Sequence, residues 1–151
     1  MKKSLIALLA VCLLAPAASF AQQEPMGRIK RLAGVVTLER GGKTLPVEVG
    51  TLVFQGDRLR TGRDGYAGLT LADDTLLTAG PGSILVLNRF AFNATTLDGE
   101  FKATLPQGNL QVVSGLIAKK SPEKFELKGR NVVLGVRGTE FILSVPGEAA
   151  E

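Results

Sequence analysis

The six residues Val136-Arg137-Gly138-Thr139-Glu140-Phe141 separate two short apolar alternations and decide how the chain is interpreted. Apolar residues occupy even positions before this stretch and odd positions after it: Val132, Leu134 and Val136, then Phe141, Leu143 and Val145. Successive side chains of a strand point to opposite faces, so both sets reach one core only if a residue is inserted. Gly138 is the expected place for this bulge or tight bend, because glycine adopts positive φ without steric cost.

Turn-forming residues divide the rest of the chain into short segments rich in Val, Leu, Thr and Phe. The expected turns are Gly41-Gly42, Arg63-Asp64-Gly65, Asp73-Asp74, Gly80-Pro81-Gly82, Asp98-Gly99 and Pro106-Gln107-Gly108. A spacing of roughly 8 to 12 residues between turns is typical of all-β sandwiches, barrels and solenoids. We therefore expect one compact all-β domain of many short strands and almost no helix. The arrangement is a β-sandwich or β-roll, with a short β-solenoid-like stack as the alternative.

The expected strands lie between these turns, at residues 29–38, 44–47, 58–61, 66–71, 76–79, 84–90, 101–105, 110–113, 125–127, 132–136 and 140–145. In the segment Ile84-Leu85-Val86-Leu87 both alternating sets are apolar. Both faces of this strand should therefore be covered, which places it in the middle of a sheet.

The first residues have the pattern of an export signal. Lys2 and Lys3 precede a short apolar stretch, and Ser19-Phe20-Ala21 offers small residues for cleavage between Ala21 and Gln22. The stretch is shorter than the roughly 20 residues that span a bilayer, so we expect a soluble periplasmic or secreted protein. Residues 1–21 form the signal peptide, 22–27 a disordered lead, 28–146 the β domain and 147–151 a disordered tail.

An alternative for this segment is acylation of Cys12, which follows Leu9-Ala10-Val11. Val11 is bulky where a lipidation signal has a small residue, and the apolar stretch continues past the cysteine. Mass spectrometry of the mature N-terminus distinguishes the two, since a lipid mass on Cys12 contradicts a soluble protein.

The chain contains no histidine, and its one cysteine lies within the expected signal peptide. Histidine is the usual general base near neutral pH and, with cysteine, the usual ligand of zinc. We therefore expect no enzymatic activity, no catalytic residue, no metal and no cofactor. Removal of residues 1–21 takes away two lysines and no acidic residue, which lowers the formal charge from +4 to +2. This charge gives no reason to expect nucleic acid as a partner.

Several motifs together resemble the FecR domain family over roughly residues 53–145. They include Gly56, Asp57, Thr61 and Gly62 in one segment, Asp73 in a second, and Val136 to Phe141 in the third. The resemblance implies a periplasmic all-β module of the kind that receives a protein signal from an outer-membrane receptor. Its motif residues are expected to be structural: Gly56, Asp57, Thr61, Gly62, Asp73, Val136, Arg137, Gly138, Thr139, Glu140 and Phe141.

The resemblance implies an envelope protein as partner, either a membrane sensor or an outer-membrane receptor. We expect the module without a sigma-regulating segment ahead of it, and only six residues follow Val145. The sequence does not specify the oligomeric state. The alternative is a module that binds cell-wall glycan or peptidoglycan, although Tyr66 is the only tyrosine and tryptophan is absent.

Three segments are candidate sites. Arg89, Phe90 and Phe92 form a possible partner-binding patch, although two phenylalanines at strand spacing are more often core. Asp73-Asp74 is interpreted as a turn in which aspartate bonds its own backbone, with calcium binding as the alternative. Arg137 and Glu140 are expected to form an ion pair with each other. Residues 119–124 are expected to form a charged loop that could contact acidic polymers.

Overall fold

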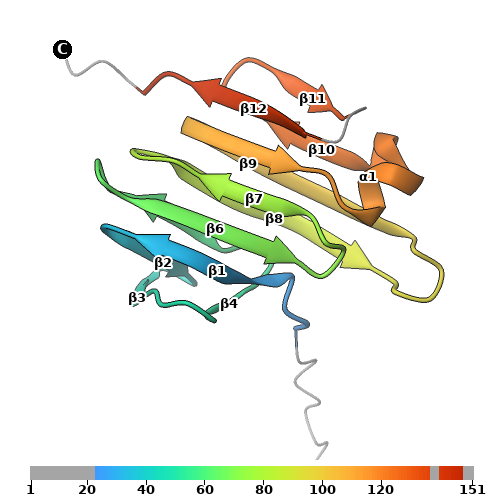
Figure 1. The fold of residues 1–151 in the computed structure, drawn as a ribbon, viewed down its shortest axis with the longest axis horizontal. Helices are drawn as coiled ribbons and strands as arrows, with labels where there is room; N and C mark the ends of the chain where they lie inside the picture. Colours follow the sequence, from blue (N-terminus) through green and yellow to red (C-terminus); the bar gives the residue numbers. More distant parts are fainter. Residues whose placement is uncertain (1–22, 137–139, 148–151) are drawn as a thin grey trace, which may run out of the picture.

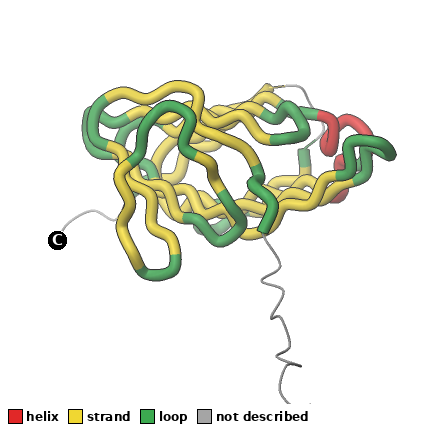
Figure 2. Tube along the Cα trace, turned by 90° about the horizontal axis from the view of Figure 1, so that it is seen from below, coloured by secondary structure: helices red, strands yellow, loops and turns green. Residues whose placement is uncertain are grey.

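A computed structural model describes residues 23–136 and 140–147, which form one 12-stranded sheet curled into two facing layers (Figure 1, Figure 2). The strands are β1 (Gly27–Ala33), β2 (Val36–Arg40), β3 (Lys43–Pro46), β4 (Leu52–Val53), β5 (Arg58–Thr61), β6 (Tyr66–Leu71), β7 (Leu76–Ala79), β8 (Ile84–Phe92), β9 (Gly99–Val113), β10 (Phe125–Lys128), β11 (Val133–Gly135) and β12 (Glu140–Val145). The expected all-β sandwich or roll is confirmed.

Strand β9 belongs to both layers. Its first part pairs with β8 and, in parallel, with β10, whereas its second part pairs antiparallel with β7 and β12. The expected turn at Pro106-Gln107-Gly108 is therefore wrong, because the chain stays extended there. Gly108, with φ of +101°, changes the direction of the strand without reversing it. A Cβ at this position would lie 2.2 Å from the Oγ of Ser83, so the close approach requires glycine.

Strands β1 and β2 were expected as one strand, and Gly34 divides them. Its φ is +62°, and its missing Cβ leaves room for the carbonyl oxygen of Asp64. The chain passes here from the layer of β1 to that of β2. Order also begins before Arg28, where the disordered lead was expected to end. Met26 is 1% exposed, and its N–H donates to the carbonyl oxygen of Val53.

The core lies between the two layers, where alternate residues of the strands are buried. Strand β8 lies between β5 and β9, so the central position expected for Ile84 to Leu87 is confirmed. Phe101 of β9 and Phe125 of β10 pack with ring centroids 4.7 Å apart. Full burial of one such side chain contributes about 1.5–3 kcal/mol. Residues 23–136 and 140–147 contain no cysteine, so no disulfide can crosslink this part of the chain and apolar packing is its main source of stability.

The change of phase at the C-terminus is present in the structure. Val136 is buried, and after the stretch the odd-numbered Leu143 and Val145 are buried while Ile142 is exposed. Gly138, the expected site of the bulge, lies outside the described residues, so its conformation stays a prediction.

Two short helices, α1 (Leu116–Lys120) and η1 (Pro122–Lys124), lie at the end of the sandwich near the β8–β9 hairpin (Figure 1, Figure 2). No helix in residues 23–136 and 140–147 has the length and apolar character needed to cross a membrane.

Candidate interaction site

Asp57 of the Gly56-Asp57 motif is fully buried and holds the start of β5 in place. Its carboxylate accepts hydrogen bonds from Nε (2.8 Å) and Nη2 (2.7 Å) of Arg40 and from the N–H of Phe54 (2.8 Å). The guanidinium lies 4.5 Å from the ring centroid of Phe54, and its hydrogen bond to Asp57 raises the pKa of Arg40. Gly56 has a φ of +92°, which the turn before Asp57 requires. The motif therefore has a structural role: it links the end of β2, the turn at Phe54 and the start of β5 through hydrogen bonds.

Thr61 and Gly62 close the far end of β5 against the turn at residues 80–83. The hydroxyl of Thr61 donates to the carbonyl oxygen of Gly80 (2.6 Å) and accepts from the N–H of Ser83 (2.8 Å). The carbonyl oxygen of Gly62 accepts from the N–H of Gly82 (2.9 Å). The hydroxyl of Thr61 and the carbonyl oxygen of Gly62 therefore both have hydrogen-bond partners within the chain.

The Asp73-Asp74 pair is a turn in which the two residues have different surroundings. Asp73 is fully buried and accepts hydrogen bonds from the N–H and hydroxyl of Thr75 and from the N–H of Ile117. Its carboxylate therefore caps the first turn of α1 from another part of the chain. Asp74 is exposed with a φ of +66°. In the described part of the chain, no group of three or more side chains is placed to hold a metal.

The last motif segment is described at its two ends. Val136 is buried, and Phe141 is partly buried against the core. The exposed Glu140 accepts a hydrogen bond from Nε2 of Gln111 (2.5 Å). Arg137, Gly138 and Thr139 lie outside the described residues, so the expected pairing of Arg137 with Glu140 stays a prediction.

The Arg89-Phe90-Phe92 segment divides between surface and core. Phe90 and Phe92 are partly buried and pack against the core, so they form no open aromatic patch. Arg89 is exposed and pairs with Glu100 of β9, which also pairs with Lys102 (3.0 Å). Hydrogen bonds from Lys102 and then from Arg89 lower the pKa of Glu100 below its ordinary value. This part of the surface therefore carries both signs of charge.

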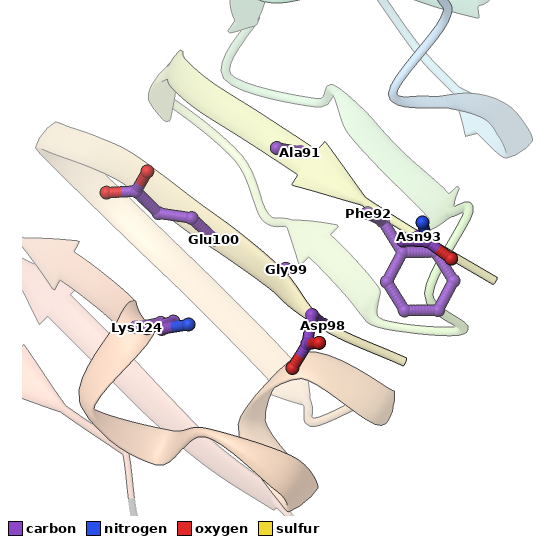
Figure 3. Close-up of a pocket in the computed structure, with 7 residues that line it drawn as sticks. All are labelled: Ala91, Phe92, Asn93, Asp98, Gly99, Glu100 and Lys124. Carbon is purple, nitrogen blue, oxygen red and sulfur yellow. The ribbon is translucent and has the colours of Figure 1, made fainter. Parts of the chain in front are cut away.

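An open hollow of about 550 Å³ lies where the β8–β9 hairpin approaches η1 (Figure 3). It is lined by Ala91, Phe92, Asn93, Asp98, Gly99, Glu100 and Lys124. The ammonium of Lys120 on α1 lies 3.0 Å from Asp98, and this hydrogen bond lowers the pKa of Asp98. In Figure 3 Lys124 lies on the side of β9 away from β8, and its amino group points toward β9.

Sequence reasoning found Phe92 but missed the rest of this hollow. Lys124 is separated from Phe92 by the whole of β9 and α1, and parallel pairing of β10 with β9 brings η1 beside the hairpin. The expected charged loop at residues 119–124 is mostly helical. The only available signal was the density of lysines there, which does not predict where they lie.

The fold and its motifs define an all-β module in which the motif side chains of Asp57, Thr61 and Asp73 are buried and hold turns and a helix in place. A model of the family described as FecR protein matches residues 57–151. This match spans well over half of the chain, and the chain belongs to the FecR family. Membership implies a role related to signal transduction at the cell envelope. No curated protein and no solved structure gave a match.

Proposed function

We propose that this chain is a non-enzymatic periplasmic module that binds another envelope protein, either a membrane sensor or an outer-membrane receptor. The main support is the way the fold uses its motif residues. Asp57, Thr61 and Asp73 are buried and bonded to other parts of the same chain. Their polar groups already form hydrogen bonds that hold turns and a helix in place. A partner would therefore be recognised by other residues, which lie on the surface.

The surface that best supports recognition is the end of the sandwich that carries the hollow. It combines the partly exposed ring of Phe92 with Asp98, Glu100 and Lys124. An aromatic side chain surrounded by charges of both signs is typical of protein interfaces, where the ring supplies contact area and the charges supply specificity. We assign the partner-binding surface to this end, with Arg89 at its border.

Photo-crosslinking in cell envelopes tests the proposal. A photoreactive amino acid at position 92 should capture one discrete protein, whereas the same group in place of Val49 should capture none. Val49 is 62% exposed on the loop between β3 and β4, so it serves as a matched surface control. Lys124→Glu should lower the crosslinking yield from position 92 without changing the circular dichroism spectrum. Equal capture from both positions would contradict the assignment.

A glycan-binding function is the second candidate, and the composition of the hollow favours it. Phe92 supplies an aromatic ring to its lining, Asn93 an amide and Asp98 a carboxylate. Aromatic faces and such polar groups are suited to sugar rings and their hydroxyls. Sedimentation with purified peptidoglycan that resists moderate salt and is lost in Phe92→Ala would favour this function over protein binding.

A further inference from the structure

The described part of the sandwich ends in four edge strands, and three of them are protected against pairing with another chain. Strand β3 carries Lys43 and Pro46. Strand β4 has only two residues, and Arg40 donates to the carbonyl oxygen of Leu52. Strand β11 has three residues. Short strands, lysine and proline are the usual devices that prevent association at sheet edges.

Strand β12 has none of these devices. It runs over six residues, Glu-Phe-Ile-Leu-Ser-Val, with neither lysine nor proline inside it. Among the described residues it pairs only with β9 and leaves its other edge open. Ile142 at its centre is 67% exposed, which is the highest value among the exposed large apolar side chains of the described chain.

The register determines which backbone groups face the open edge. The hydrogen bond from the N–H of Gly80 to the carbonyl oxygen of Asn109 sets the phase of β9. Odd-numbered residues of β9 bond to β7, so its even-numbered residues bond to β12. Each even-numbered residue of β9 faces an odd-numbered residue of β12. The N–H and C=O groups of Ile142 and Ser144 therefore point away from β9 and are available to another strand.

We infer that β12 pairs antiparallel with β12 of a second copy of this chain, about a two-fold axis at Ile142. The sequence of the strand is complementary to itself in this register. Ile142 meets Ile142 of the second copy, and Glu140 meets Ser144, whose hydroxyl can donate to the carboxylate. Moving the axis to Phe141 would set Glu140 against Ile142 and desolvate a charge on an apolar side chain, and moving it to Leu143 would set Ile142 against the polar Ser144 and lose the contact between the two isoleucines.

The pairing extends the layer of β12 across two molecules and gives an isologous, closed dimer. It does not use the hollow at the β8–β9 hairpin, and it does not rest on the proposed function. A dimer would present two copies of the same recognition surface to an envelope partner.

Light scattering coupled to size-exclusion chromatography tests the dimer, using exported chain purified from cells over about 1 µM to 1 mM. Ile142→Lys and Ile142→Glu each place like charges face to face at the axis. Each should weaken dimerisation roughly a hundredfold. Mixing the two variants should restore a heterodimer, because the charges are then opposite. The exposed position of Ile142 makes loss of folding an unsuitable explanation for such a pattern.

A second pair of variants tests the backbone bonds. Ser144→Pro removes an N–H that points to the open edge and should yield a monomer with an unchanged circular dichroism spectrum. Thr44→Pro is the control, because Thr44 has the strand parity of the native Pro46 on the edge strand β3. This control should leave the dimer intact. A wild-type monomer at every concentration, including one whose β12 captures a different protein, overturns the inference, as does a dimer that survives Ser144→Pro.

Discussion

Arg40 and Asp57 join the end of β2 to the start of β5 through a two-bond ion pair, with Nε to Oδ1 at 2.8 Å and Nη2 to Oδ2 at 2.7 Å. The carboxylate is buried, whereas the arginine side chain is 38% exposed. The planar guanidinium suits this paired geometry, and the ring of Phe54 packs against it. The Gly-Asp motif therefore acts as a tie between two strands of one layer.

Asp57→Ala is expected to lower the free energy of unfolding by about 1–3 kcal/mol, because it leaves the N–H of Phe54 without an acceptor and the partly exposed guanidinium of Arg40 without its ion-pair partner. Urea denaturation measures the loss. Glu48→Ala, at an exposed loop position, should stay within about 0.5 kcal/mol of the wild type. Similar midpoints for the two variants would contradict the structural role of the motif.

Asp73→Ala should destabilise the protein by about 3 kcal/mol, since the buried N–H groups of Thr75 and Ile117 lose their acceptor. Hydrogen exchange gives a specific readout of the cap on α1. The amide of Ile117 should exchange faster relative to core amides such as that of Leu105. The exposed Asp64→Ala variant is the control, and unchanged protection of Ile117 would argue against a capping role.

Replacement of Asp74 by glycine should stabilise the fold by up to about 1 kcal/mol, because Asp74 has a φ of +66° that costs an L-residue conformational energy. Asp74→Val should have the opposite effect, since a β-branched side chain is poorly accommodated there. Thermal melting of the two variants should bracket the wild type. A lower melting temperature for Asp74→Gly would show that the aspartate side chain itself supports the turn.

Substitutions of Gly108 and Gly82 by alanine can distinguish two reasons for a glycine, a lack of space for a Cβ and a positive φ. Both have positive φ, but a Cβ at Gly108 would collide with the backbone and side chain of Ser83, whereas nothing lies within 4 Å of a Cβ at Gly82. Gly108→Ala should therefore cost clearly more than the roughly 1–2 kcal/mol of left-handed strain expected for Gly82→Ala. Equal losses in urea denaturation would mean that the β9 bend relaxes to accept the methyl group.

The stability contributed by Glu100 should depend on pH. Hydrogen bonds from Lys102 and Arg89 lower its pKa from the ordinary 4.5. A lowered pKa in the folded state stabilises the protein above the ordinary value, and this contribution is lost as the pH falls through the lowered pKa. The stabilities of wild type and Glu100→Gln should therefore differ at neutral pH, and the difference should shrink as the pH falls below the ordinary pKa of 4.5 and vanish below the lowered pKa. Added salt should reduce the neutral-pH difference, and a constant gap across the acid range would refute the linkage.

Most strand positions could be predicted from the sequence because alternation of apolar residues and the turn residues between them are local signals. The central position of β8 and the change of phase before β12 follow from the same period-2 geometry. The errors have a shared physical cause. At Gly34 and Gly108 a glycine takes positive φ so that another segment can approach closely, and that segment is distant in the sequence. Local patterns alone do not show whether such a glycine divides a strand or only bends it.

Much less of the candidate site could be predicted from the sequence, because the site is formed by the tertiary structure. The sequence singled out Phe92 and the motif aspartates, but only the fold buries Asp57 against Arg40 and brings Lys124 beside the β8–β9 hairpin. The amino-acid sequence by itself determined the family, the all-β class and the order of the strands, since these follow from residue spacing along one segment at a time. Tertiary structure alone decided which charges are paired, which ring lines a hollow and which strand edge stays open. Those properties arise where segments far apart in the chain meet, and burial there sets the strength of each contact.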